Sequence, residues 1–136
     1  MEKEAMALQN QFPNQFQFIK QQLPRETVAA FWWETFAFLS VPVYDGYSAS
    51  VAEGRYVGAI PMVNAIPGNL EVIRHEWNGL VINPLSAVSI SQTLERIEQE
   101  PEMATVFASR NQSWIRQHSM LKDSARQFLD WAAMNF

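Results

Sequence analysis

Two carboxylates, Asp45 and Glu53, stand eight positions apart on either side of a run of small residues at 48–50. An apolar segment precedes Asp45, and the Asp45-Gly46 pair is typical of a tight turn. The small residues predict the start of a short helix that carries Glu53 and ends at Gly58. Because the first amides of a helix lack partners and the helix dipole is positive there, this helix start is suited to bind an anion such as phosphate.

The two carboxylates add the capacity to recognise hydroxyl groups, since ionised acidic side chains accept hydrogen bonds. A ligand with hydroxyls on both sides of a phosphate group would satisfy Asp45, Glu53 and the amides between them, and nucleotide-sugars have this layout. A structural alternative stays open. Ser50 and Glu53 have the spacing of a capping box, in which Glu53 accepts a hydrogen bond from the Ser50 amide.

The segments around this helix predict an α/β fold. Strands are expected at 16–19, 37–41, 59–63 and 80–82. Helices are expected at 1–10, 24–34, 48–57 and 67–75, and from residues 86, 101 and 119 onward. This alternation predicts a three-layer, Rossmann-like domain spanning residues 1–136, with a mainly parallel sheet of about four strands, helices on both faces and a helical C-terminus. Ligands of such sheets bind at the carboxyl ends of the strands.

Two burial patterns follow from the apolar residues. The strand at 37–41 is continuously apolar, which predicts burial on both faces. The last helix, 119–134, is expected to pack through one apolar stripe. That stripe consists of Leu121, Ala125, Phe128, Leu129 and Ala132.

The composition excludes several function classes. A chain of 136 residues with 48% hydrophobic and 18% charged residues is globular rather than disordered. Its net charge of -4 argues against a nucleic-acid partner. It has no cysteine, its first 20 residues lack the pattern of a signal peptide, and its longest apolar run is interrupted. We therefore expect a cytoplasmic protein with at most peripheral membrane contact.

Motifs for metal and cofactor chemistry are missing. His75 and His118 are isolated, so no metal site is expected, and the sequence contains no Asp-x-Asp. It also lacks the glycine-rich fingerprints of dinucleotide and NTP sites and the Gly-x-Ser-x-Gly of hydrolases. No cofactor is therefore predicted.

The residues of segment 45–63, with Asp45, Glu53 and Gly58, resemble the signature of the group 1 glycosyltransferases. These are retaining, nucleotide-sugar-dependent enzymes with two Rossmann domains, the GT-B architecture. The family pattern has two glutamates eight positions apart, beginning Glu-Gly-Phe-Gly, and then a Gly-x-Pro-Val-Val strand. A Gly-x-x-Glu turn and an Asn-Gly-Leu-Leu-Val strand follow, and here 67–71 and 78–82 stand in that order. Segments 16–20, 23–26 and 38–42 also match, so the resemblance covers roughly residues 14–118.

The resemblance implies a role for each residue of the segment. Asp45 takes the place of the carboxylate that contacts the donor sugar and is the catalytic candidate, and Glu53 would hold the ribose hydroxyls. The donor-binding set that it implies is Tyr47, Ser48, Ala49, Ser50 and Glu53. Two departures stand out: Asp45 replaces a glutamate, and Ser48 replaces a common glycine, which narrows the room for close backbone approach.

The chain is thus expected to be the donor-binding portion of a glycosyltransferase that moves a hexosyl group from a nucleotide diphosphate sugar to an unknown acceptor. The family's C-terminal domain begins with two further strands and a helix that carry a basic pair for the diphosphate. The sequence starts after them, so we expect a domain incomplete at its N-terminus, which another domain or a second copy completes. Two alternatives stay open: a non-enzymatic interaction or assembly module, and a fragment of a GT-B nucleotide-sugar epimerase.

Overall fold

The computed structural model describes residues 2–118 and 121–135, without the side chains of 121, 122, 124, 127, 128, 131 and 135. The chain forms two compact units, Met1–Ala30 and Phe31–Phe136. Helix α1 (Glu2–Gln11) belongs to the first unit, and α2 (Arg25–Glu34) begins in the first and ends in the second. Every described strand lies in the second unit, which therefore holds the α/β fold.

The expected strand at 16–19 is wrong, since this segment is irregular and its residues are at least partly exposed. The backbone amide of Phe18 donates a hydrogen bond to the Gln9 side chain (2.6 Å) instead of to a strand. Alternation of Phe16 and Phe18 predicts a strand only when another strand pairs with it, and the described part of this unit contains none. The sheet accordingly has three described strands rather than about four.

The sheet is parallel, with the strand order β1-β2-β3. Its strands are β1 (Ala37–Ser40), β2 (Ile60–Asn64) and β3 (Leu80–Ile82). The central strand β2 is buried along its whole length. The edge strand β1 is only half-buried, and Leu39 is 42% exposed. The prediction that both faces of this strand are buried is therefore wrong.

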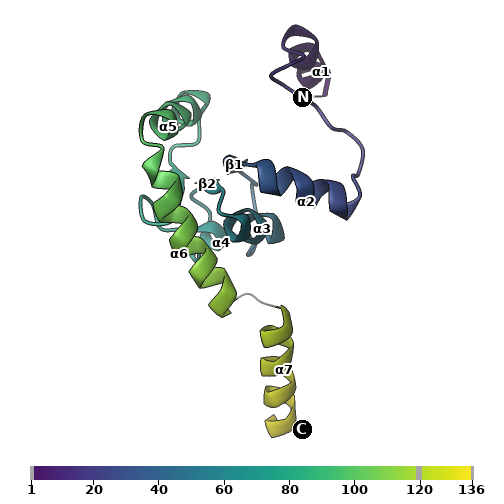
Figure 1. The fold of residues 1–136 in the computed structure, drawn as a ribbon, viewed down its shortest axis with the longest axis vertical. Coiled ribbons are helices and arrows are strands. Elements are labelled where there is room, and N and C mark those ends of the chain that lie inside the picture. The colour runs from purple at the N-terminus through teal and green to yellow at the C-terminus, as the bar shows by residue number, and fades with distance from the viewer. Residues whose placement is uncertain (1, 119–120, 136) are drawn as a thin grey trace. The chain divides into compact units, whose positions relative to one another are not determined.

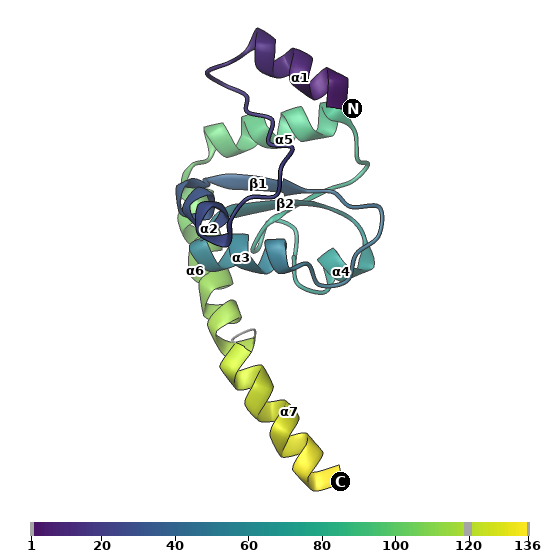
Figure 2. The same ribbon diagram turned by 90° about the vertical axis from the view of Figure 1, so that its right-hand side faces the viewer.

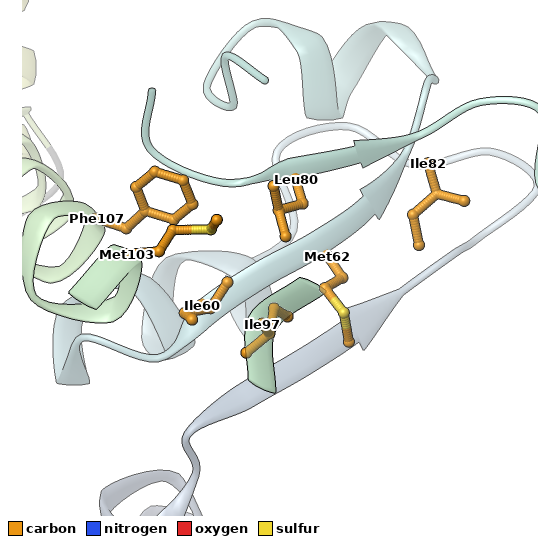
Figure 3. Close-up of a cluster of buried hydrophobic side chains, with 7 residues drawn as sticks. All are labelled: Ile60, Met62, Leu80, Ile82, Ile97, Met103 and Phe107. Carbon is orange, nitrogen blue, oxygen red and sulfur yellow. The ribbon is translucent and has the colours of Figure 1, made fainter. Parts of the chain in front are cut away.

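Helices cover both faces of the sheet, as predicted. Figure 2 shows α5 (Ala87–Gln99) on one face and α3 (Ala49–Val57) with α4 (Pro67–Leu70) on the other. Because successive side chains of a strand point to opposite faces, β2 contributes Ile60 and Met62 to one core cluster and Val63 to the other. The larger cluster is drawn in Figure 3. It consists of Ile60, Met62, Leu80, Ile82, Ile97, Met103 and Phe107.

Helix α6 (Glu102–His118) starts directly after Pro101 and closes the larger cluster at the end where β2 begins. In Figure 3, Met103 and Phe107 lie near Ile60, whereas Ile82 lies at the opposite end of the cluster. The ribbon of Figure 1 shows α6 running on past α3. Helix α6 therefore connects the core to the flank of the helix that carries the candidate site.

The last helix, α7 (Leu121–Asn135), forms as predicted, but its expected buried stripe is wrong at two positions. Ala125 is exposed and Leu129 is 65% exposed. The side chains of Leu121 and Phe128 lie outside the described part of the chain. Among the helices that the structure describes, none is both long enough and apolar enough to cross a bilayer.

Candidate functional site

The candidate site is the start of α3, which follows the carboxyl end of β1 after a short loop. Ser48 is the N-cap: its backbone is extended (φ -68°, ψ 128°), and its carbonyl accepts a hydrogen bond from the Ala52 amide (3.1 Å). The amides of Ala49, Ser50 and Val51 therefore have no partner within the helix. The Ser48 hydroxyl makes no capping bond, so it is also free to contact a ligand.

The capping-box interpretation of Ser50 and Glu53 is wrong. It requires Ser50 to be the N-cap, whereas the helix begins after Ser48. Glu53 instead accepts a hydrogen bond on Oε2 from the indole nitrogen of Trp32 (3.1 Å). The Trp32 ring also packs edge-on against Phe38 of β1, with ring centroids 5.2 Å apart. Glu53 is exposed, and a carboxylate with one such donor retains acceptor capacity for hydroxyl groups.

Asp45 lies half-buried in the loop between β1 and α3. No hydrogen bond or ion pair to its carboxylate forms among the described residues. Its backbone carbonyl lies close to Gly68, where an added Cβ would approach it to 2.7 Å. The main chain of Asp45 is therefore held in place while its carboxylate remains available as an acceptor.

The Tyr47 side chain lies along the flank of α3. Its hydroxyl accepts a hydrogen bond from Nη1 of Arg55 (3.4 Å). Its ring meets Trp114 of α6 edge-on, with centroids 6.2 Å apart. The Tyr47 side chain is therefore held by Arg55 and Trp114, while its backbone amide can still bind a ligand.

Buried asparagines, which the sequence analysis missed, hold the loop before α3. The Asn64 side chain at the end of β2 donates to the Pro42 carbonyl (2.7 Å). The Asn69 side chain in α4 donates to the carbonyl of Asn64 (3.1 Å) and to its side-chain oxygen (2.9 Å). Since a buried amide must find partners, the asparagine that ends the apolar run of β2 was a usable signal in the sequence.

Gly68 is a second support that the sequence analysis missed. A Cβ at this position would collide with the carbonyl oxygens of Asp45 and Gly46, so the turn and the start of α4 are in close backbone contact. Nothing lies within 4 Å of a Cβ built on Gly46 itself. The close approach thus depends on the glycine in α4 and not on the glycine in the turn.

Metal ligands do not gather in the part of the chain that the structure describes, where no three His, Asp or Glu side chains meet. The His75 ring accepts a hydrogen bond from the Val81 amide (3.0 Å), and the His118 ring stacks on Trp114 (centroids 4.8 Å). His75 thus makes a local hydrogen bond and His118 a local ring contact.

No family model matches the chain. A curated relative, glycosyltransferase 1 domain-containing protein 1 of Xenopus tropicalis, is 27% identical over 105 residues. The match covers 71% of this chain and 30% of the relative.

Several solved structures share the fold. The C-terminal domain of the group 1 family glycosyl transferase LpcC from Francisella tularensis has a TM-score of 0.74 at 14% identity, covering 88% of this chain and 63% of that domain. Anabaena HepE in complex with UDP-glucose has a TM-score of 0.80 at 12% identity, covering 98% and 37%. Sucrose-phosphate synthase from Thermosynechococcus elongatus has a TM-score of 0.81 at 17% identity, covering 98% and 34%. The chain thus spans less than two thirds of each of these proteins.

Proposed function

We propose that the start of α3 binds a nucleotide diphosphate sugar. The chain resembles the C-terminal domain of group 1 GT-B glycosyltransferases in fold and in sequence. The chain would be the donor-binding portion of an enzyme that transfers a hexosyl group. Anabaena HepE was crystallised in complex with UDP-glucose, and a nucleotide-sugar of this kind suits the candidate site here.

One observation carries this proposal: unpaired helix amides stand between two carboxylates that can still accept hydrogen bonds. The exposed amides of residues 49 and 50 follow an N-cap that uses no side-chain bond. Asp45 and Glu53 lie on either side of these amides in the sequence. The amides in the middle can donate hydrogen bonds to a diphosphate, and the carboxylates on both sides can accept hydrogen bonds from sugars at its two ends.

The roles divide along the helix start. The exposed amides of Ala49 and Ser50, with the Ser48 hydroxyl, would bind the distal phosphate. Glu53 would accept from the ribose hydroxyls and Asp45 from the donor sugar, where it is also the catalytic candidate. An acceptor, and a domain or second copy that completes the site, belong to the same proposal.

Calorimetric titration of the full chain with UDP, GDP and ADP tests the proposal. We expect saturable one-site binding of at least one nucleotide. A folded chain that binds none of the three would overturn the proposed function.

Glu53→Gln sharpens this test, because it removes the charge of the proposed ribose acceptor. Losing a hydrogen bond to a charged group should weaken nucleotide binding by about tenfold or more, while the melting temperature changes little. Glu98→Gln is the matched control, since this exposed residue of α5 undergoes the same charge change away from α3. A variant at Glu53 that loses stability but binds nucleotide normally would assign the residue a structural role.

A further inference from the structure

Arg55 is a fully buried charged residue in the middle of the molecule's second unit, with 0% of its surface exposed. Its Nε donates to the Asn111 side chain (2.9 Å), and its guanidinium lies 4.6 Å from the Trp114 ring centroid. No carboxylate pairs with it among the described residues, and its Nη2 has no hydrogen-bond partner there. Burial lowers the pKa of Arg55 while Tyr47 acts in the opposite direction, and an arginine nevertheless stays charged at neutral pH.

Stability alone does not account for an arginine at this position. A buried charge without a counter-ion is unfavourable, and an apolar side chain of similar length would avoid that cost. The hydrogen bonds of Arg55 connect two parts of the second unit.

On the side of α6, the guanidinium meets a rigid support. Asn111 accepts from Arg55 and donates through its own amide to the carbonyl of Asn78 (2.7 Å). Asn78 is in turn fixed by bonds to the Val72 carbonyl (2.9 Å) and from the Arg74 amide (2.7 Å). Because Asn78 and Asn111 are both buried, this chain of bonds is protected from competition by water.

On the other side, the guanidinium meets the candidate site. Nη1 of Arg55 donates to the Tyr47 hydroxyl, and Tyr47 directly precedes the N-cap Ser48. In the described part of the chain, Tyr47 is the one residue of segment 45–50 whose side chain bonds to another residue. Helix α3 itself packs along α6, and the turn before it is attached to this helix pair through the Tyr47 hydroxyl bond and ring contact.

We infer that Arg55 is a positioning residue: together with Trp114 of α6 it holds the Tyr47 side chain and thereby fixes the backbone at the start of α3. The functional part of this inference rests on the proposed function, because the fixed backbone is the proposed phosphate site. The positioning itself is a property of the protein without a ligand and can be measured separately.

The experiment compares Tyr47→Phe and Arg55→Met with the wild-type full chain. Tyr47→Phe removes only the hydroxyl, and Arg55→Met removes the donor while keeping an unbranched side chain. Tyr56→Phe is the matched control, since Tyr56 lies on α3 next to Arg55, is 40% exposed like Tyr47 and makes a similar ring contact with Trp33. Hydrogen exchange of the Ala52 amide, whose bond to the Ser48 carbonyl closes the first turn of α3, is measured without ligand. UDP, GDP and ADP affinities are measured by calorimetry.

We expect exchange of the Ala52 amide to quicken by about fivefold in both variants, as the loss of one hydrogen bond implies, and to stay unchanged in Tyr56→Phe. The melting temperature of Arg55→Met should fall, because the buried Asn111 oxygen loses its donor. Nucleotide affinity should fall by a similar factor in both variants. Exchange that matches Tyr56→Phe, or that quickens equally over β2 and all of α3, would overturn the inference. If the wild-type chain binds no nucleotide, the proposed function fails, while the exchange data still decide the positioning.

Discussion

The two carboxylates of the candidate site differ in their surroundings. Glu53 is already bonded to the indole of Trp32, which fixes one of its oxygens. The Asp45 carboxylate has no partner among the described residues, although the Asp45 backbone is held against Gly68. A ligand hydroxyl that binds the Asp45 carboxylate therefore displaces only water. Asp45 should affect the binding affinity only of ligands that are long enough to contact it.

This difference yields a prediction about selectivity. Asp45→Asn should weaken binding of UDP-glucose by about tenfold, because a hydrogen bond to a charged acceptor is lost, while UDP binding stays nearly constant. The ratio of the two dissociation constants, measured by calorimetry on the same preparations, is the relevant quantity. An equal loss of affinity for both ligands would mean that Asp45 does not contact the sugar.

Most of the candidate segment could be predicted at the residue scale, because small residues, a turn and a terminal glycine are local signals. Gly58 does end α3, with a positive φ of 95°. The contacts of Glu53 and Tyr47 could not be predicted. Their partners, Trp32 and Arg55, are identified by tertiary packing, and nothing in the spacing of the sequence distinguishes a buried arginine from an exposed one.

At the scale of elements, strand β2 and helix α4 position the start of α3. The loop before it is bonded to the end of β2 through Asn64, and its turn packs on the start of α4 through Gly68. These supports come from segments later in the chain, so changes in α4 should alter binding at α3.

The two glycines of this contact provide a paired test. Gly68→Ala should displace the turn at Asp45, lower stability by about 1–3 kcal/mol and weaken nucleotide binding, because its Cβ overlaps backbone oxygens. Gly46→Ala should be tolerated, since its Cβ meets nothing within 4 Å. Thermal melting and nucleotide titration of both variants check this, and a tolerated alanine at 68 would contradict the proposed support.

Element type was more predictable than element burial. The other helices and three of the strands form where the local pattern of apolar residues predicts them. The helix expected at 67–75 ends at Leu70, and the strand at 16–19 lacks a partner and does not form. Leu39 of β1 and Leu129 of α7 are exposed although their sequences suggest burial. Burial depends on what packs against an element, and that information is not local.

At the scale of the whole molecule, the three described strands form a parallel sheet between helical layers. The chain spans 30% of the length of its Xenopus relative. Our proposal for this chain is that the start of α3 binds the diphosphate of a nucleotide-sugar.

Mapping of backbone amide chemical shifts by NMR during titration with UDP, GDP and ADP tests that claim most directly. The amides of Ala49 and Ser50 should shift most in response to whichever nucleotide binds, with smaller changes at Asp45 and Glu53. Saturable binding with the largest shifts elsewhere, or no shift at these two amides with any nucleotide, would contradict the account.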